Sequence, residues 1–116
     1  MSILDINKLK LQPAVKEAFE GQDVYILPTL NSLDMIARYR ELTELTELDK
    51  DGEAYSMKVA AIYVRYHIVD KKGKRLFTQT VDELIQDFNG DAIDRLYGLV
   101  EKRLMQTEAS EPEKNS

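Results

Sequence analysis

The stretch EAYSMKVAAIYVRYHIV, residues Glu53–Val69, decides the fold of this 116-residue chain. Two apolar ladders run along it at the three- and four-residue spacing of an α-helix. They are Met57, Ala60, Ala61, Val64 and Ile68, and Tyr55, Val59, Ile62, Tyr66 and Val69. The segment Val59–Val69 also suits a strand, but the ladders and the length favour a helix. Because a helix that is apolar nearly all round is buried, Glu53–Val69 is predicted to be the central helix.

A β-hairpin is predicted before this helix. Gly21–Asp23 supplies turn chemistry, and Val24–Leu27 is a run of β-forming side chains closed by Pro28. We therefore expect strands at Ala14–Glu20 and Val24–Leu27. Since an isolated hairpin is barely stable in water, it must pack on helices or on a partner. The first dozen residues predict a loose arm or a short helix that ends at Pro13.

Three more helices are predicted around the central one. Asn31 can cap a first helix, whose end ELTELTEL (41–48) repeats every third residue and predicts a frayed or 3₁₀-like terminus. One apolar face of this helix is formed by Met35, Tyr39, Leu42 and Leu45. Thr80–Glu83 is a capping box for a short helix that Asn89-Gly90 ends. Asp91 is expected to cap the last helix.

These elements predict one α+β domain that is mostly α, with a small N-terminal β-hairpin packed on about four helices. A chain of this length fits one domain and can bury a sizeable core. The domain is expected to span residues 1–107. Residues 108–116 have no apolar periodicity and predict a disordered C-terminal tail.

Composition restricts the function. The chain has no cysteine, which excludes disulfides, thiolate catalysis and cysteine zinc sites, and it has one histidine, His67. Its formal net charge of -5 disfavours nucleic-acid binding, because phosphate backbones repel an acidic domain. No apolar run approaches the roughly 20 residues of a membrane span, and the N-terminus lacks the pattern of a secretory signal.

Two loops resemble ligand sites without matching them. The basic segment DKKGKR, Asp70–Arg75, lacks both the P-loop and the dinucleotide glycine patterns, so it predicts a solvated turn with Gly73 at positive φ. Phosphate binding is the alternative. Leu76 and Phe77 after it are expected to anchor the chain on the core. The segment LDKDGE (48–53) resembles part of an EF-hand loop, but Lys58 stands where the bidentate Glu belongs.

No catalytic, cofactor-binding or metal-binding residue is predicted. His67 lies on the apolar central helix and has no carboxylate–nucleophile pair around it, which favours a packing role over that of a catalytic base. The acidic pairs Asp82/Glu83, Asp91/Asp94 and Glu44/Glu47 are expected to cap helices or solubilise the chain.

Recognition by a partner is the remaining type of function that the residues support. Tyrosine is favoured at protein interfaces, and methionine adapts to varied partners. The candidate partner-binding residues are Tyr25 on the hairpin and Met35 and Tyr39 on the first helix. The unpaired edge of the hairpin is a further candidate. The sequence leaves self-association open.

The order of these segments resembles the tail assembly chaperones of long-tailed bacteriophages. The resemblance covers Val15–Leu104 and rests on VKEAFEGQDVYILPTLN (15–31), NSLDMIARYREL (31–42), KVAAIYVRYHIVD (58–70), DKKGKRLFT (70–78) and TVDELIQDFNGDAIDRLYGLVEKRL (80–104). Val69-Asp70, Gly73, Arg75–Phe77 and Ala92–Leu96 match its most characteristic positions. The hairpin departs from the family in having Phe19 where a tryptophan is common.

The resemblance implies a protein without enzymatic activity or cofactor. It would bind the tape measure protein in the host cell cytoplasm, keep it soluble and help recruit tail tube subunits, and it would be absent from the mature virion. A structural protein of the tail or head–tail connector is the alternative. A small regulatory enzyme or nucleic-acid binder is a third class, against which His67, the missing cysteine and the acidic charge count.

The resemblance also implies a frameshift near the end of the chain. Glu113, Lys114 and Asn115 can be encoded as GAA-AAA-AAC, which contains a slippery run. On this hypothesis, a minority of chains continue into an added domain after a minus-one slip. Chance occurrence of Glu-Lys-Asn in a charged tail is the alternative, and an AAG lysine codon would exclude this slip site.

Overall fold

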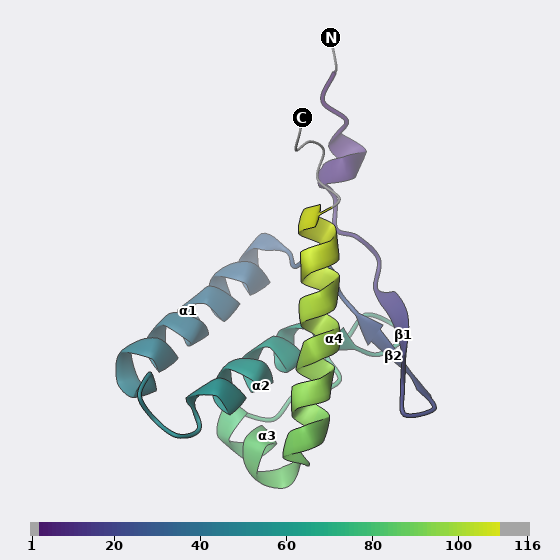
Figure 1. The fold of residues 1–116 in the computed structure, drawn as a ribbon. Coiled ribbons are helices and arrows are strands. Elements are labelled where there is room, and N and C mark those ends of the chain that lie inside the picture. The colour runs from purple at the N-terminus through teal and green to yellow at the C-terminus, as the bar shows by residue number, and fades with distance from the viewer. Residues whose placement is uncertain (1–2, 110–116) are drawn as a thin grey trace.

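The computed structural model describes residues 3–109. In chain order it contains the 3₁₀ helix η1 (Ile6–Leu9), strands β1 (Val15–Phe19) and β2 (Gln22–Ile26), helices α1 (Ser32–Asp49) and α2 (Tyr55–His67), strand β3 (Ile68–Val69), and helices α3 (Val81–Asp87) and α4 (Gly90–Ala109). Figure 1 shows the arrangement. The predicted class, α+β and mostly α, is confirmed.

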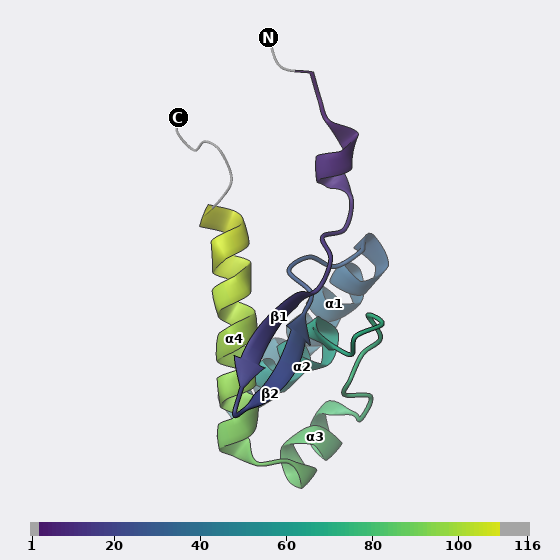
Figure 2. The same cartoon turned by 90° about the vertical axis from the view of Figure 1, so that its right-hand side faces the viewer.

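Helix α2 is the centre of the domain, as predicted. It contacts α1, α3, α4 and β3, and Figure 2 shows the sheet and α4 on one side of the molecule. Its first apolar ladder faces the core, where Ala61 and Val64 are fully buried. The other buried members of the core cluster are Ala60 of α2, Ile26 of β2, Ile68 of β3, Leu84 of α3, and Ile93, Leu96 and Val100 of α4. Burial of these side chains positions the sheet, α3 and α4 on α2.

The central helix is shorter than predicted. It begins at Tyr55 and ends at His67, so the prediction of a helix from Glu53 through Val69 is wrong at both ends. Ile68 and Val69 form β3 instead, opposite Ile26 and Tyr25 of β2. The backbone groups along the edge of β2 need hydrogen-bond partners, and β3 supplies some of them. The sheet is therefore three-stranded, in the order β1-β2-β3, rather than a lone hairpin.

The hairpin turn lies earlier than predicted. Phe19 is opposite Gln22, so Glu20 and Gly21 form a two-residue turn, with φ values of 51° and 78°. Positive φ at both positions matches the right-handed twist of the strands, which explains why the turn is not at Gly21–Asp23. Strand β2 consequently begins at Gln22 instead of Val24.

The helix caps are partly as predicted. Asn31 Oδ1 accepts a hydrogen bond from Asp34 N at 2.8 Å, and Thr80 and Glu83 form the expected capping box. Asp91 does not cap α4, because Asn89 Oδ1 accepts from Asp91 N at 2.8 Å and fills that role. Helix α1 stays α-helical through Asp49, so the prediction of a 3₁₀-like end is wrong.

Helix α4 extends past the predicted domain boundary. Its backbone is helical through Ala109, two residues into the segment expected to be a tail. Residues 110–116 lie outside the described range. The predicted frameshift codons Glu113, Lys114 and Asn115 therefore lie outside it too.

Candidate protein-binding surface

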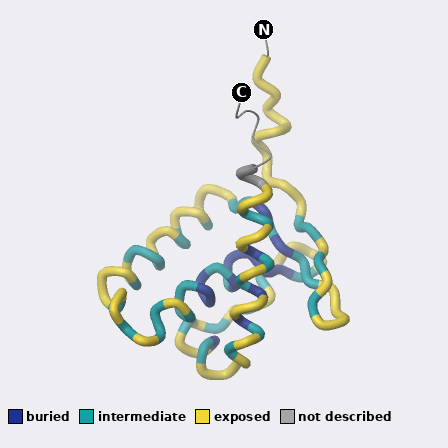
Figure 3. Tube along the Cα trace, in the orientation of Figure 1, coloured by how far each residue is buried: buried dark blue, intermediate teal, exposed yellow. Residues whose placement is uncertain are grey.

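Helix α1 contacts α2 through a polar face. No residue of α1 is buried, and Figure 3 shows no buried segment along it. The polar contacts to α2 join Arg38 to His67 at 2.5 Å, Glu41 to Arg65 at 2.9 Å, Thr46 to Tyr55 at 2.8 Å and Asp49 to Lys58 at 3.1 Å. Asp34 contacts Arg75, in the turn after β3, at 3.3 Å. An apolar core therefore does not hold this helix in place.

His67 is the buried end of one of these contacts. Its side chain is fully inaccessible. Arg38 Nη1 can only donate, so His67 Nε2 must accept, and His67 Nδ1 then donates to the Leu27 carbonyl at 2.8 Å. Burial, together with the Arg38 charge and against the opposing effect of the Leu27 hydrogen bond, lowers the pKa of His67 from 6.5 to about 4. A neutral imidazole thus joins α2 to α1 and to Leu27, the residue after β2, and His67 is packed as predicted.

A second cluster lies around the buried ring of Tyr66. Its hydroxyl donates to Glu41, and the Arg75 guanidinium stacks on its face with the carbon Cζ 3.9 Å from the ring centroid. Burial and the Glu41 carboxylate raise the pKa of Tyr66 above its ordinary value. Arg65 also donates to the Gln79 carbonyl at 2.6 Å. These directional contacts fix the rotation of α1 about its own axis.

The opposite face of α1 is apolar and faces solvent. It consists of the exposed Met35, Ile36 and Tyr39 and the half-buried Leu42 and Thr43, which we call the α1 stripe. These residues recur at the three- and four-residue spacing that places side chains on one side of a helix. Met35 is 50% exposed, Ile36 51% and Tyr39 71%. Tyr39, Leu42, Thr43, Thr46 and Glu47 line a shallow depression there. The usual orientation of a surface helix, apolar side inward, is reversed.

The structure unites two of the three predicted partner-binding residues. Met35 and Tyr39 are one helical turn apart on the α1 stripe. Tyr25 is half-buried on β2, opposite Lys16 and Val69, so it belongs to a different surface. Ile36 was not predicted as a site residue. The sequence signal that could have identified Ile36 is the set of charges at Asp34, Arg38 and Glu41. If these residues face inward, helical spacing places Ile36 outward.

The two loops that resemble ligand sites are structural. Asp70 Oδ1 accepts from the backbone N–H groups of Lys74 at 3.0 Å and Lys72 at 2.8 Å, and these bonds, the Lys74 bond first, lower the pKa of Asp70. Gly73 has a φ of +85°, as predicted for this turn. At the other loop, Lys58 Nζ forms an ion pair with the Asp49 carboxylate at 3.1 Å, so this carboxylate already has a cationic partner.

Only part of the predicted anchor after the basic turn is correct. Phe77 packs against the core and meets Phe88 edge to face, with 5.5 Å between the ring centroids. Leu76 is mostly exposed, so its predicted anchoring role is wrong. The backbone explains this result: Leu76 N donates to the Ile68 carbonyl at 3.1 Å, which holds the main chain on β3 while the side chain stays in solvent.

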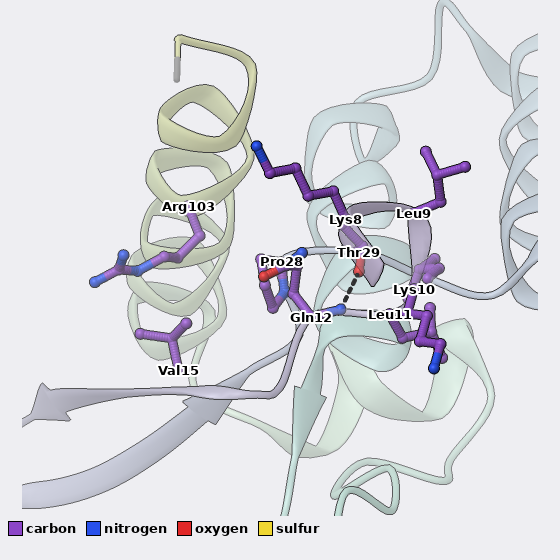
Figure 4. A pocket seen from close by; sticks show the side chains of 10 residues that line it. Lys8, Leu9, Lys10, Leu11, Gln12, Val15, Pro28, Thr29 and Arg103 are labelled. Carbon is purple, nitrogen blue, oxygen red and sulfur yellow. Dashed lines mark hydrogen bonds between the residues drawn. The ribbon is translucent and has the colours of Figure 1, made fainter. Parts of the chain in front are cut away.

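A cleft lies where the N-terminal residues meet the domain. Figure 4 shows Lys8, Lys10 and Arg103 among its lining residues. The Arg103 guanidinium is directed to the half-buried Glu17, with 2.7 Å from Nε to the carboxylate, so its charge is already compensated. Both lysines are exposed to solvent. The cleft is therefore a junction between the N-terminal segment and the sheet, with no assembled cluster of polar groups for a ligand.

The described residues form no metal site and no membrane-spanning helix, and the chain has no match among known proteins. Within residues 3–109, the structure contains no group of three or more side chains placed to hold a metal ion. In that same range, no helix combines the length and apolar character needed to span a membrane. No family model, curated protein or solved structure matches the chain.

Proposed function

We propose that this protein is a phage tail assembly chaperone that binds the tape measure protein, keeps it soluble and helps recruit tail tube subunits in the host cytoplasm. The α1 stripe is the observation that carries the proposal. It places Met35, Ile36 and Tyr39 on an outward face, at 50% exposure or more. The resemblance of Val15–Leu104 to these chaperones indicates that the protein bound by the stripe is the tape measure protein. The protein is then absent from the finished virion.

The mechanism is temporary cover of an apolar helix. A tape measure protein is long, helical and rich in apolar residues, so its exposed faces aggregate before the tube assembles around them. An amphipathic client helix can place its apolar side along the α1 stripe, in the way that helices dock on apolar grooves elsewhere. The net charge of -5 keeps such a complex soluble. Tube subunits then replace the chaperone.

A binding role fits the polar groups better than a catalytic one. Both ring nitrogens of His67 are occupied, one by Arg38 and one by the Leu27 carbonyl. A general base needs a nitrogen within reach of a substrate proton, and this imidazole offers none. We therefore propose a protein without catalytic residues or a cofactor.

Co-expression with the tape measure protein tests the proposal. The client should be captured by the wild-type chain and stay in the soluble fraction, whereas Tyr39→Glu should reduce both capture and solubility at least about tenfold, because a charge would be buried on docking. Leu48→Glu is the matched control. Leu48 is 85% exposed on the same helix and lies nine residues from Tyr39, on the opposite side.

The outcomes separate the alternatives. Equal loss of capture in both variants would show that the stripe is not the binding face. Absence of capture by the wild-type chain and by a frameshift-extended form would overturn the chaperone proposal. Detection of the chain in purified virions would favour a structural protein of the tail or head–tail connector. The codons for Glu113, Lys114 and Asn115 decide whether the extended form can arise at the proposed slip site.

A further inference from the structure

The N-terminal residues 3–12, which we call the arm, carry apolar side chains that the domain does not cover. Ile3, Leu4, Ile6, Leu9 and Leu11 are 58–89% exposed. Helix η1 organises the arm locally, because Asp5 Oδ1 accepts from Asn7 N at 3.0 Å. A side-chain contact to the domain is the hydrogen bond from Gln12 N to Thr29 Oγ1 at 3.1 Å, drawn in Figure 4. Large apolar side chains that are exposed together on one segment are the usual mark of an interaction site.

The arm is directed away from the α1 stripe of its own chain. Figures 1 and 2 show the arm extending out of the domain in the same direction as the C-terminal end of α4, and Figure 1 shows α1 running away from the arm. The anchor at Thr29 is near the start of α1, whereas the stripe runs along α1 away from that point. The described residues thus contain two apolar surfaces that do not cover each other.

The charges beside these two surfaces are complementary. The arm has Asp5 followed by Lys8 and Lys10, and the outer side of α1 has Arg40 followed by Glu44 and Glu47. Asp5 and Lys10 flank η1 in extended conformation, so the five residue steps between them span roughly 10–15 Å, and Arg40 to Glu47 spans about 10 Å at the rise of an α-helix. If the arm runs parallel to α1, Asp5 therefore faces Arg40, and Lys8 and Lys10 face Glu44 and Glu47. No ion pair within residues 3–109 engages Arg40, Glu44 or Glu47.

We infer that the arm of one copy lies along the α1 stripe of a second copy, and that the exchange is reciprocal in a two-fold symmetric dimer. A second copy supplies both surfaces at equal concentration, and closed two-fold symmetry satisfies them all without leaving a free end. The inference stands on these two surfaces and does not depend on the phage client. If the client docks on the stripe, it must displace the arm, so dimerisation protects the stripe before the client arrives.

Engineered cysteines test the contact directly, because the chain has none of its own. Purified Leu9→Cys and Tyr39→Cys chains are mixed under mild oxidation, and the crosslinked fraction is read on a non-reducing gel. We expect at least about tenfold more mixed dimer than in the control mixture of Leu9→Cys with Leu48→Cys, whose thiol lies on the other side of α1. Equal crosslinking in the two mixtures would overturn the inference.

Charge reversal in the full-length chain gives a second test. The dimer should weaken about tenfold in Lys8→Glu/Lys10→Glu, measured by sedimentation equilibrium, and should recover when Glu44→Lys/Glu47→Lys is added. Far-UV circular dichroism checks that each variant folds. A wild-type chain that is monomeric up to millimolar concentration, or a lack of recovery in the combined variant, would refute the exchange. Neither readout uses the client, so failure here leaves the chaperone proposal standing, and failed client capture leaves the dimer standing.

Discussion

Helices α1 and α4 both pack on α2, but they do so with opposite chemistry. Helix α4 turns Ile93, Leu96 and Val100 to α2, all of them buried, and leaves charged residues such as Asp94 and Glu101 in solvent. Helix α1 instead turns Arg38, Glu41 and Asp49 to α2 and leaves Met35, Ile36 and Tyr39 of its stripe in solvent. The difference shows that α4 contributes to the apolar core, whereas α1 is oriented by ion pairs and hydrogen bonds that leave its stripe exposed.

The largest expected effect is on the α4 side. Ile93→Ala removes a side chain that is 2% exposed in the core cluster and should lower the free energy of unfolding by about 2–5 kcal/mol, through lost burial and the cavity left behind. Urea unfolding followed by circular dichroism measures it. Asp94→Ala, an exposed neighbour, should change the value by less than about 0.5 kcal/mol. A loss for Ile93→Ala as small as the control's would contradict the assignment of α4 to the core.

Acidification should weaken the α1 contact next. The unfolded chain protonates His67 near pH 6.5 and the folded chain only near pH 4, so stability present above pH 6.5 is lost as the pH falls through this window. The loss should reach about 3 kcal/mol. His67→Gln keeps a donor for Leu27 and an acceptor for Arg38 without titrating, and it corrects for carboxylates that titrate nearby. Parallel stability curves for the two proteins between pH 6.5 and 4 would exclude this role.

Removal of one ionic contact should have a smaller and local effect. Glu41→Ala deprives Arg65 and the Tyr66 hydroxyl of their acceptor and should cost about 1–3 kcal/mol. Hydrogen–deuterium exchange should accelerate along α1 while the amides of α4 keep their protection. Leu48→Ala, at an exposed position of α1 outside the stripe, is the control and should leave both helices unchanged. Uniform acceleration across the domain would mean that α1 does not open separately.

The smallest effect is expected on the α1 stripe itself. Tyr39→Ser changes a side chain that is 71% exposed and should alter the free energy of unfolding by less than about 0.5 kcal/mol. The thermal midpoint measures it. Tyr66→Phe is the comparison from the inner side, because it removes the hydroxyl that donates to Glu41. If Tyr39→Ser were as destabilising as Ile93→Ala, the stripe would have to be part of the core.

Local patterns predicted most of the fold. The two ladders of Glu53–Val69 identified the buried helix, since helical periodicity depends only on residues within a few turns. The caps at Asn31 and Thr80 were also correct, because each bonds to a backbone N–H three residues away. Strand β3 was missed because its two residues owe their conformation to β2, more than forty positions earlier in the chain.

The reversed orientation of α1 needed tertiary information. The apolar face of a helix usually turns inward, but Asp34, Arg38 and Glu41 have partners 24 to 41 residues away that turn this side of α1 inward instead. These partners lie on α2 and on the turn after β3, so no window of sequence around α1 contains them. Met35 and Tyr39 could be proposed as site residues from residue type alone. Their joint placement with Ile36 on one exposed face followed only from the fold.

The polar contacts of Asp34, Arg38, Glu41 and Asp49, which we call the polar seam of α1, have a consequence for how this protein can evolve. Substitutions in the seam alter the orientation of the whole helix, whereas substitutions in the stripe leave the folded state almost unchanged in free energy. If the stripe binds a partner as proposed, selection for a new partner can act on Met35, Ile36 and Tyr39 without first acquiring compensating stability elsewhere. On that proposal, recognition and folding are encoded on different sides of one helix, so a lineage can change one while it retains the other.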